Sequence, residues 1–230
     1  MTMSTQSSLA ELAAPGGTRF DFWSRVVANR RVRRLAEIGV WKGDFAEALF
    51  STCPDIETYY LVDPWKHLDD WAKPANVDDD RFSEHYAGVI ARTEPWAQKR
   101  VVLRGRTTEV SDQIPDDSLD FAYIDGDHSL RGISIDLVQM WPKIRAGGLI
   151  GGDDFQPSVW QHSGKFEPTV VFPLAVYFAE AVGACIEAFP RSQFAIHKTN
   201  DRFIFVDHTG KYGDLTLRTA LRGRNRERAN

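Results

Sequence analysis

The stretch from Leu119 to Asp154, LDFAYIDGDHSLRGISIDLVQMWPKIRAGGLIGGDD, decides the fold. It begins with a short apolar run, 119–124, of the kind that forms a buried strand. Apolar residues then recur at helical spacing through 130–144, and Gly147-Gly148 leads into a second apolar run at 148–151. A strand, a helix and a strand in this order predict a βαβ unit with parallel strands.

Short apolar strands continue to alternate with helical segments on the N-terminal side of this unit. We predict further strands at 34–39, 59–63 and 101–103, and helices at 20–30, 44–50 and 81–92. This alternation predicts an α/β fold with a Rossmann-like, doubly wound, mostly parallel sheet and helices on both faces.

The C-terminal part departs from this alternation. Three strand-like runs follow one another at 185–189, 193–197 and 202–206. The residues Thr199-Asn200-Asp201 between the last two runs favour a turn. We therefore predict that the last two runs form a closing antiparallel hairpin.

Composition narrows the class of protein. The 230 residues are 43% hydrophobic and 26% charged, which suits one globular domain with a sizeable core. The formal net charge of −4 argues against nucleic acid as a main partner. Two cysteines, Cys53 and Cys185, are too few for a disulfide framework or a Cys-rich zinc site and favour a reducing compartment. Because we see neither a signal peptide nor an apolar run of membrane-spanning length, we expect a cytoplasmic protein without a membrane partner.

We divide the chain into three parts. Residues 1–30 form an N-terminal extension with a lead-in helix, 31–210 form the main domain, and 211–230 form a basic tail that we expect to be solvated. The sequence does not fix the oligomeric state, and a homodimer is one of the states that it allows.

Polar or glycine residues follow the end of every predicted parallel strand. In an open parallel sheet the ligand binds outside the carboxyl ends of the strands. The candidate residues at these ends are Glu37, Gly39, Gly43, Asp63, Gly105, Thr107, Asp125, Asp127, His128, Asp153 and Asp154. Such groups at five successive strand ends predict a binding site along this edge.

The first strand end carries a glycine motif beside an acid. Gly39 and Gly43 are spaced G-x-x-x-G rather than G-x-G-x-x-G, so a pyrophosphate cradle is not indicated. Glu37 suits a ligand ammonium group instead. Asp63 lies 24 residues beyond Gly39, at the end of the second strand, where an acid can hold ribose hydroxyls. The alternative is an ordinary glycine at a helix start and an aspartate on the surface.

Four aspartates, Asp125, Asp127, Asp153 and Asp154, crowd like charges at adjacent strand ends. Their repulsion is costly unless a cation neutralises it or their pKa values rise. Hard oxygen ligands favour Mg²⁺ or a similar ion over zinc, although acids after strands can also cap helices. His128 follows directly and, with an ordinary pKa near ~6.5, is a candidate general base, for which Asp127 is the competitor.

Together, Glu37-x-Gly39-x-x-x-Gly43, Asp63 and the stretch 119–154 resemble class I S-adenosylmethionine-dependent methyltransferases. The resemblance is to the metal-dependent O-methyltransferase branch, which includes macrocin-type and mycinamicin-type sugar methyltransferases and mycobacterial methylmannoside methyltransferases. Catechol O-methyltransferase is more distantly similar. The resemblance covers about residues 30–207, and 119–154 is its most specific part.

The resemblance implies a role for each matching residue. Glu37, Gly39 and Gly43 would cradle the amino-acid part of S-adenosylmethionine, Asp63 would bind its ribose, and Gly105 and Thr107 would border its adenine. Asp125, Asp153 and Asp154 would hold Mg²⁺, with Asp125 also bordering the cofactor, and His128 would be the base. Many relatives carry Gly-His-Asp where this chain has Gly152-Asp153-Asp154. The implied activity is Mg²⁺-dependent methylation of a hydroxyl on a sugar or glycosylated natural product by the domain at 31–210.

Two segments, 66–80 and 156–168, are expected to form the acceptor pocket. Trp71, Trp160, His162 and Lys165 are the candidate contacts, because aromatic faces pack on sugar rings and polar side chains bind hydroxyls. Three alternatives remain open at this point: a haloacid-dehalogenase-like Mg²⁺ phosphohydrolase using the D-x-D of Asp125 and Asp127, a nicotinamide oxidoreductase, and a non-catalytic cofactor or glycan binder.

Overall fold

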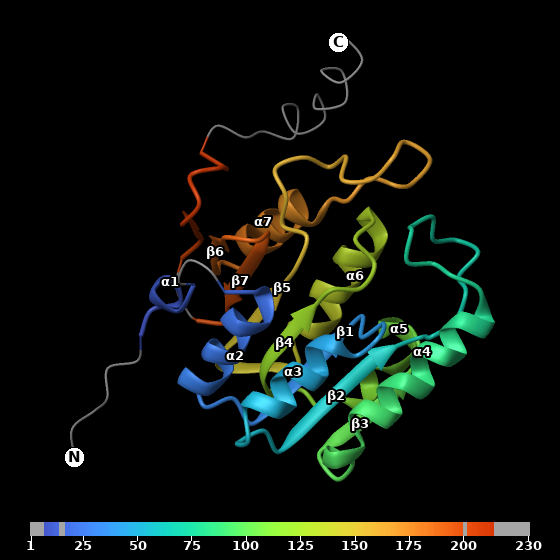
Figure 1. The fold of residues 1–230 in the computed structure, drawn as a ribbon. Helices are drawn as coiled ribbons and strands as arrows, with labels where there is room; N and C mark the ends of the chain where they lie inside the picture. The colour runs from blue at the N-terminus through green and yellow to red at the C-terminus, as the bar shows by residue number, and fades with distance from the viewer. Residues whose placement is uncertain (1–6, 14–16, 200–201, 214–230) are drawn as a thin grey trace.

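A computed structural model of the chain describes residues 7–13, 17–199 and 202–213. Its strands form one sheet in the order β3-β2-β1-β4-β5-β7-β6-β8 (Figure 1). The strands are β1 (Arg34–Ile38), β2 (Thr58–Asp63), β3 (Arg100–Arg104), β4 (Leu119–Ile124), β5 (Ile144–Gly152), β6 (Cys185–Phe189), β7 (Gln193–His197) and β8 (Ile204–Asp207). β1 to β5 pair in parallel, which confirms the predicted mostly parallel, doubly wound sheet.

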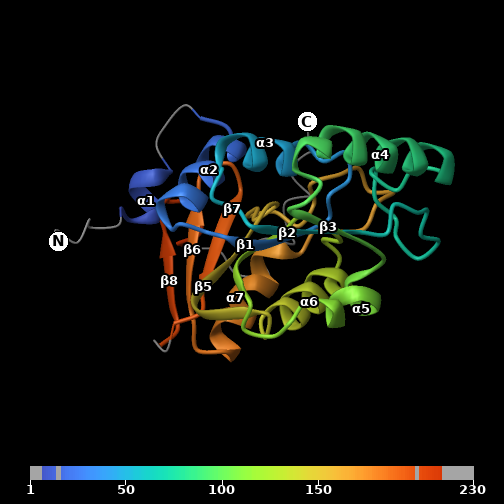
Figure 2. The same cartoon turned by 90° about the horizontal axis from the view of Figure 1, so that it is seen from below.

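Helices cover both faces of the sheet, as predicted (Figure 2). One face carries α1 (Leu9–Leu12), α2 (Arg19–Asn29), α3 (Asp44–Thr52) and α4 (Asp79–Arg92), and the other carries α5 (Thr107–Val110), α6 (Leu130–Met140) and α7 (Val171–Ala181). Each face has its own apolar core. The strands between them are apolar on both sides, as a doubly covered parallel sheet requires.

The helix α2 confirms the predicted lead-in helix at 20–30. Thr18 and Asp21 form a reciprocal capping box at its start, so side chains satisfy the first free backbone N–H groups. Trp23 is fully buried against β4, with its ring stacked on Phe121 at 4.9 Å between centroids. Gly151 in β5 makes room for it, because a Cβ there would lie 2.1 Å from the indole ring. The helix is therefore firmly packed on the sheet.

The predicted helix 130–144 is shorter in the structure, where α6 ends at Met140. Pro142 has no N–H to continue the helical hydrogen bonds, and the chain turns into β5, which begins at Ile144 rather than at 148. The sequence pattern did not indicate α7, because its almost uninterrupted apolar residues show no clear helical period.

The structure confirms a C-terminal antiparallel hairpin, but the predicted pairing of 193–197 with 202–206 is wrong. The antiparallel hairpin is β6–β7, and its turn contains Arg191 and Ser192 with positive φ. β7 also pairs antiparallel with β5, so both of its edges are occupied. β8 pairs instead with the free edge of β6, in parallel. The turn residues Asn200 and Asp201 lie outside the described residues.

Most of the predicted basic tail, 214–230, lies outside the described residues as well. Within the ranges that are described, no helix has the length and apolar character needed to cross a membrane.

Candidate functional site

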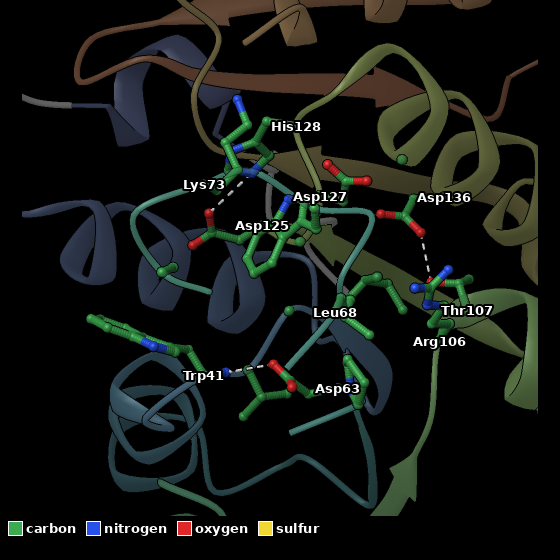
Figure 3. A pocket seen from close by; sticks show the side chains of 18 of the residues that line it. Trp41, Asp63, Leu68, Lys73, Arg106, Thr107, Asp125, Asp127, His128 and Asp136 are labelled. Carbon is green, nitrogen blue, oxygen red and sulfur yellow. Dashed lines mark hydrogen bonds and ion pairs between the residues drawn. The ribbon is translucent and has the colours of Figure 1, made fainter. Parts of the chain in front are cut away.

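A cavity of about 520 Å³ opens at the carboxyl ends of the parallel strands. Its size is typical of a small-molecule or cofactor site. The predicted strand-end residues that line this cavity are Glu37, Gly39, Asp63, Gly105, Thr107, Asp125, Asp127, His128, Asp153 and Asp154. Figure 3 labels Asp63, Thr107, Asp125, Asp127 and His128 among them. The fold therefore gathers the predicted residues at one site.

Gly43 is the one predicted strand-end residue that does not line the cavity. It precedes α3 in a left-handed conformation, and a Cβ there would lie 2.9 Å from Val89 of α4. Gly39 has φ +90°, and a Cβ there would lie 2.3 Å from the backbone oxygen of Asp125. Only glycine allows the turn after β1 to pass this close to the end of β4.

Glu37 is a buried acid that faces the cavity from β1. It is 2% exposed, and the hydroxyl of Tyr59 donates a 2.8 Å hydrogen bond to its carboxyl group. Burial raises the pKa of Glu37 well above its ordinary value. A buried carboxyl group that gains a cationic partner can ionise, so this position suits a ligand ammonium.

Asp63 holds the two loops that border the cavity next to it. One of its carboxylate oxygens accepts a 2.8 Å hydrogen bond from the backbone N–H of Trp41 (Figure 3), and the other accepts one of 2.7 Å from the backbone N–H of Trp65. Burial raises the pKa of Asp63. Because each oxygen has a further lone pair, the side chain can also accept hydrogen bonds from a ligand diol.

Asp136 is a cavity residue that the sequence reasoning missed. It lies on α6, is buried, and accepts a 2.6 Å hydrogen bond from the hydroxyl of Thr107 (Figure 3). Burial raises the pKa of Asp136 to about 7. The available signal was an acid on the otherwise apolar face formed by Ile133, Leu137 and Met140.

Arg19 is the second residue that was missed. It is the first residue of α2, and its Nη1 atom donates a 2.8 Å hydrogen bond to Asp125 and also pairs with Asp153. The other oxygen of Asp153 accepts bonds from Gln193 at 2.6 Å and from the backbone N–H of Asp154 at 2.7 Å. No local pattern reveals this pairing, because Arg19 lies more than 100 residues away in the sequence.

His128 lies between two of the predicted metal ligands. Its Nδ1 atom is 2.6 Å from Asp154, and its Nε2 atom is 3.5 Å from Asp125. Although burial alone would lower it, the two carboxylates raise the pKa of His128 to about 10. In this arrangement the two carboxylates stabilise the charged imidazolium, so His128 can act as a base only after it has lost this proton. Asp127 accepts two 2.9 Å hydrogen bonds from Ser129, at the start of α6.

The predicted metal ligands do not gather around one point. In the parts of the chain that are described, no three acidic, histidine or cysteine side chains are grouped as a metal site. Positive and negative groups instead alternate from Asp153 through Arg19, Asp125 and His128 to Asp154. The donor set in this arrangement does not fit a divalent ion, because protein cations already pair with all three carboxylates.

The two predicted acceptor segments contact each other above the cavity. Lys73 donates hydrogen bonds to the backbone oxygens of Glu167 and Pro168 at 2.8 and 3.0 Å, and to the Thr169 hydroxyl at 3.1 Å. Asp70 pairs with two arginines at the opposite wall, Arg106 and Arg131. Of the four predicted contacts, Trp71 and His162 line the cavity, whereas Trp160 and Lys165 do not.

The sequence model described as "Methyltransferase domain" matches residues 36–155, about half of the chain. This match begins within β1, spans β2, β3 and β4, and ends just beyond β5. The chain also resembles the uncharacterized protein y4gI of Sinorhizobium fredii, with 25% identity over 162 residues. That match covers 67% of this chain but only 17% of y4gI.

Solved structures with this fold include three methyltransferases. The O-methyltransferase TomG from Streptomyces achromogenes, in complex with SAM, has a TM-score of 0.53 and 12% identity over 85% of this chain and 91% of its own. The SAH-bound methyltransferase PaMTH1 of Podospora anserina has a TM-score of 0.54 and 12% identity. An O-methyltransferase from Bacillus cereus, in complex with SAH, has a TM-score of 0.52 and 16% identity. The last two each cover 82% of this chain and 86% of their own.

Proposed function

The chain belongs to the methyltransferase-domain family, and on this premise we propose that it transfers a methyl group from S-adenosylmethionine to a hydroxyl oxygen of a small molecule. The observation that supports this most is the cavity that unites Glu37, Gly39 and Asp63 at the carboxyl end of β1 and β2. The D-x-D phosphohydrolase alternative leaves these three residues without a role, and the family match includes the D-x-D segment itself.

The residues of the cavity suit S-adenosylmethionine at each polar part. Among the residues that the structure describes, no cation hydrogen-bonds to the buried Glu37, which suits the ammonium group of the methionine moiety. Because Gly39 has no side chain, a ligand can approach the backbone at the turn after β1. Asp63 has two carboxylate oxygens that can accept hydrogen bonds from the ribose diol. The resemblance puts the adenine ring beside Gly105 and Thr107, and Asp136 accepts a hydrogen bond from Thr107 next to this position. The bound cofactor supplies a methyl group that is already activated on a sulfonium sulfur.

The chain itself must position the acceptor hydroxyl and remove its proton. Positioning alone contributes much of the rate of such in-line transfers. We propose a sugar or glycosylated natural product as acceptor, held under the joined segments 66–80 and 156–168 with Trp71 and His162 as contacts. Asp127 and His128 are the two proposed proton acceptors. Mg²⁺ has no part in this proposal, because Arg19 and His128 already pair with the carboxylates that would hold the ion.

Binding and turnover assays together test this function. Isothermal titration calorimetry with S-adenosylhomocysteine should show one site, and a panel of saccharide and polyketide-glycoside acceptors should yield a methylated product by mass spectrometry. Among variants that still bind S-adenosylhomocysteine, D127N and H128N should differ, and the one that loses kcat identifies the base. Binding without any methylated product would favour the non-catalytic binder, and hydrolysis of p-nitrophenyl phosphate with Mg²⁺ would favour the phosphohydrolase.

A further inference from the structure

We propose that Arg19 supplies, from the start of α2, a positive charge that offsets the repulsion between Asp125 and Asp153, and that a divalent cation can occupy this place only by displacing it. The expectation that methyl transfer needs no divalent ion rests on the proposed function. The competition between Arg19 and an ion rests on the geometry of the charged groups alone.

A single guanidinium nitrogen joins the two aspartates. Nη1 of Arg19 lies within hydrogen-bond distance of one oxygen of Asp125 and one of Asp153. The two carboxylates are only 19% and 16% exposed, so their mutual repulsion is weakly screened by solvent. The guanidinium stays charged at any physiological pH. The chain itself thus supplies a positive charge that offsets the repulsion within the acid pair.

The position of Arg19 is fixed by packing rather than left to a mobile side chain on the surface. Four residues further along α2, the indole N–H of Trp23 donates a 2.7 Å hydrogen bond to Gln193. The same Gln193 donates a 2.6 Å hydrogen bond to Asp153. Gly151 accommodates the indole ring, so α2 cannot move from β5 without opening the core. One connected set of contacts therefore orients both the guanidinium and its acidic partner.

A divalent ion would need the oxygens that Arg19 now holds. It would also need Asp154, which pairs with His128 at 2.6 Å. An ion placed between the aspartates beside a retained guanidinium would meet like-charge repulsion in a partly buried place. Arg19 therefore lowers the affinity of the acid pair for Mg²⁺. The same guanidinium is a hydrogen-bond donor at the wall of the cavity, where a developing negative charge on an acceptor oxygen would be stabilised.

The test compares Mg²⁺ binding by the wild type, R19M and R19K. Calorimetric titration with MgCl₂ should show Mg²⁺ binding to R19M at least about tenfold more tightly than to the wild type, whereas R19K should match the wild type. The control is R25M on the same helix, since Arg25 bonds to the backbone of Leu12 and does not line the cavity. It should leave Mg²⁺ binding unchanged. If R19M does not fold, as judged by thermal unfolding, R19Q takes its place.

Equal Mg²⁺ affinity in the wild type and R19M would overturn the proposal, as would tight Mg²⁺ binding by the wild type. S-Adenosylhomocysteine is titrated into the same samples as a separate readout. If S-adenosylhomocysteine fails to bind while R19M and the wild type differ in Mg²⁺ affinity, the proposed function is wrong but the competition between Arg19 and the ion is supported. Where methyl transfer is observed, the wild type should retain it in EDTA.

Discussion

The substitution Glu37→Gln provides the sharpest test of the cofactor site. Gln has nearly the same shape and can still accept the 2.8 Å hydrogen bond from Tyr59, so the fold should be kept. It cannot carry the negative charge that the proposed ammonium partner needs. Truncating one side of a buried charge pair costs about 2–5 kcal/mol. Because Glu37 has a raised pKa and must first lose its proton, we expect the lower part of this range, about 2–3 kcal/mol.

This loss corresponds to S-adenosylhomocysteine binding about 30- to 150-fold more weakly, measured by calorimetry near neutral pH. The pH dependence gives a second readout. The folded, unliganded protein keeps Glu37 protonated above its ordinary range, and the ammonium ionises it, so binding releases a proton. The affinity of the wild type should therefore rise with pH, by at most about tenfold per pH unit, until the pH reaches the raised pKa of Glu37. The affinity of E37Q for S-adenosylhomocysteine should not show this rise with pH.

The unliganded stability separates a binding effect from a folding effect. Since ionising a buried Glu37 opposes folding as the pH rises above its unfolded value, E37Q should unfold at the same temperature as the wild type or higher. E47Q is the matched control, because Glu47 lies half-exposed on α3, pairs with Arg92 and does not line the cavity, and it should leave S-adenosylhomocysteine binding unchanged. An E37Q variant that binds S-adenosylhomocysteine within twofold of the wild type would refute the assignment of Glu37 to the ammonium group.

Three further substitutions test the structure around the site. G39A should lose most S-adenosylhomocysteine binding, because a Cβ would lie 2.3 Å from the backbone oxygen of Asp125; calorimetry showing wild-type affinity would contradict the tight turn. W23A should lower the free energy of unfolding by about 3–5 kcal/mol in urea titrations, because it empties a fully buried indole site; a loss below 1 kcal/mol would show that α2 is not anchored there. Burial alone would raise the pKa of Glu187, but hydrogen bonds from His197 and His208 hold it below its ordinary value. The ionised Glu187 therefore stabilises the folded state above its unfolded pKa of about 4.3, and this stabilisation is lost as the pH falls through the folded pKa. E187Q should therefore flatten the acid side of the stability profile, and an unchanged profile would exclude this contribution.

Local patterns were sufficient for the strands and helices that lead to the site. The apolar run ending in Ile124, the helical spacing after Ser129 and the apolar run at 148–151 within β5 each indicate their structure within a few residues. Because parallel strands end at the same edge of a sheet, the order of these elements also placed Glu37, Asp63 and the four aspartates around one cavity.

Strand pairing at the C-terminal end could not be read in this way. The turn signal between β7 and β8 is local, but the partner of β8 depends on which strand edge is left free after β7 has paired with both β5 and β6. Similarly, Gly43 matches a binding motif in spacing, yet its role against Val89 depends on where α4 packs.

The sequence by itself determined the α/β architecture and the set of acids at the edge of the sheet, since both follow from short-range periodicity and the rule for parallel strands. Only the tertiary structure decided how the charge on those acids is neutralised. Arg19 reaches Asp125 and Asp153 because Trp23 packs into the space above Gly151, which is a contact between distant segments. The interaction energy of such a pair depends on distance in space and on burial, and neither is encoded in the local order of residues.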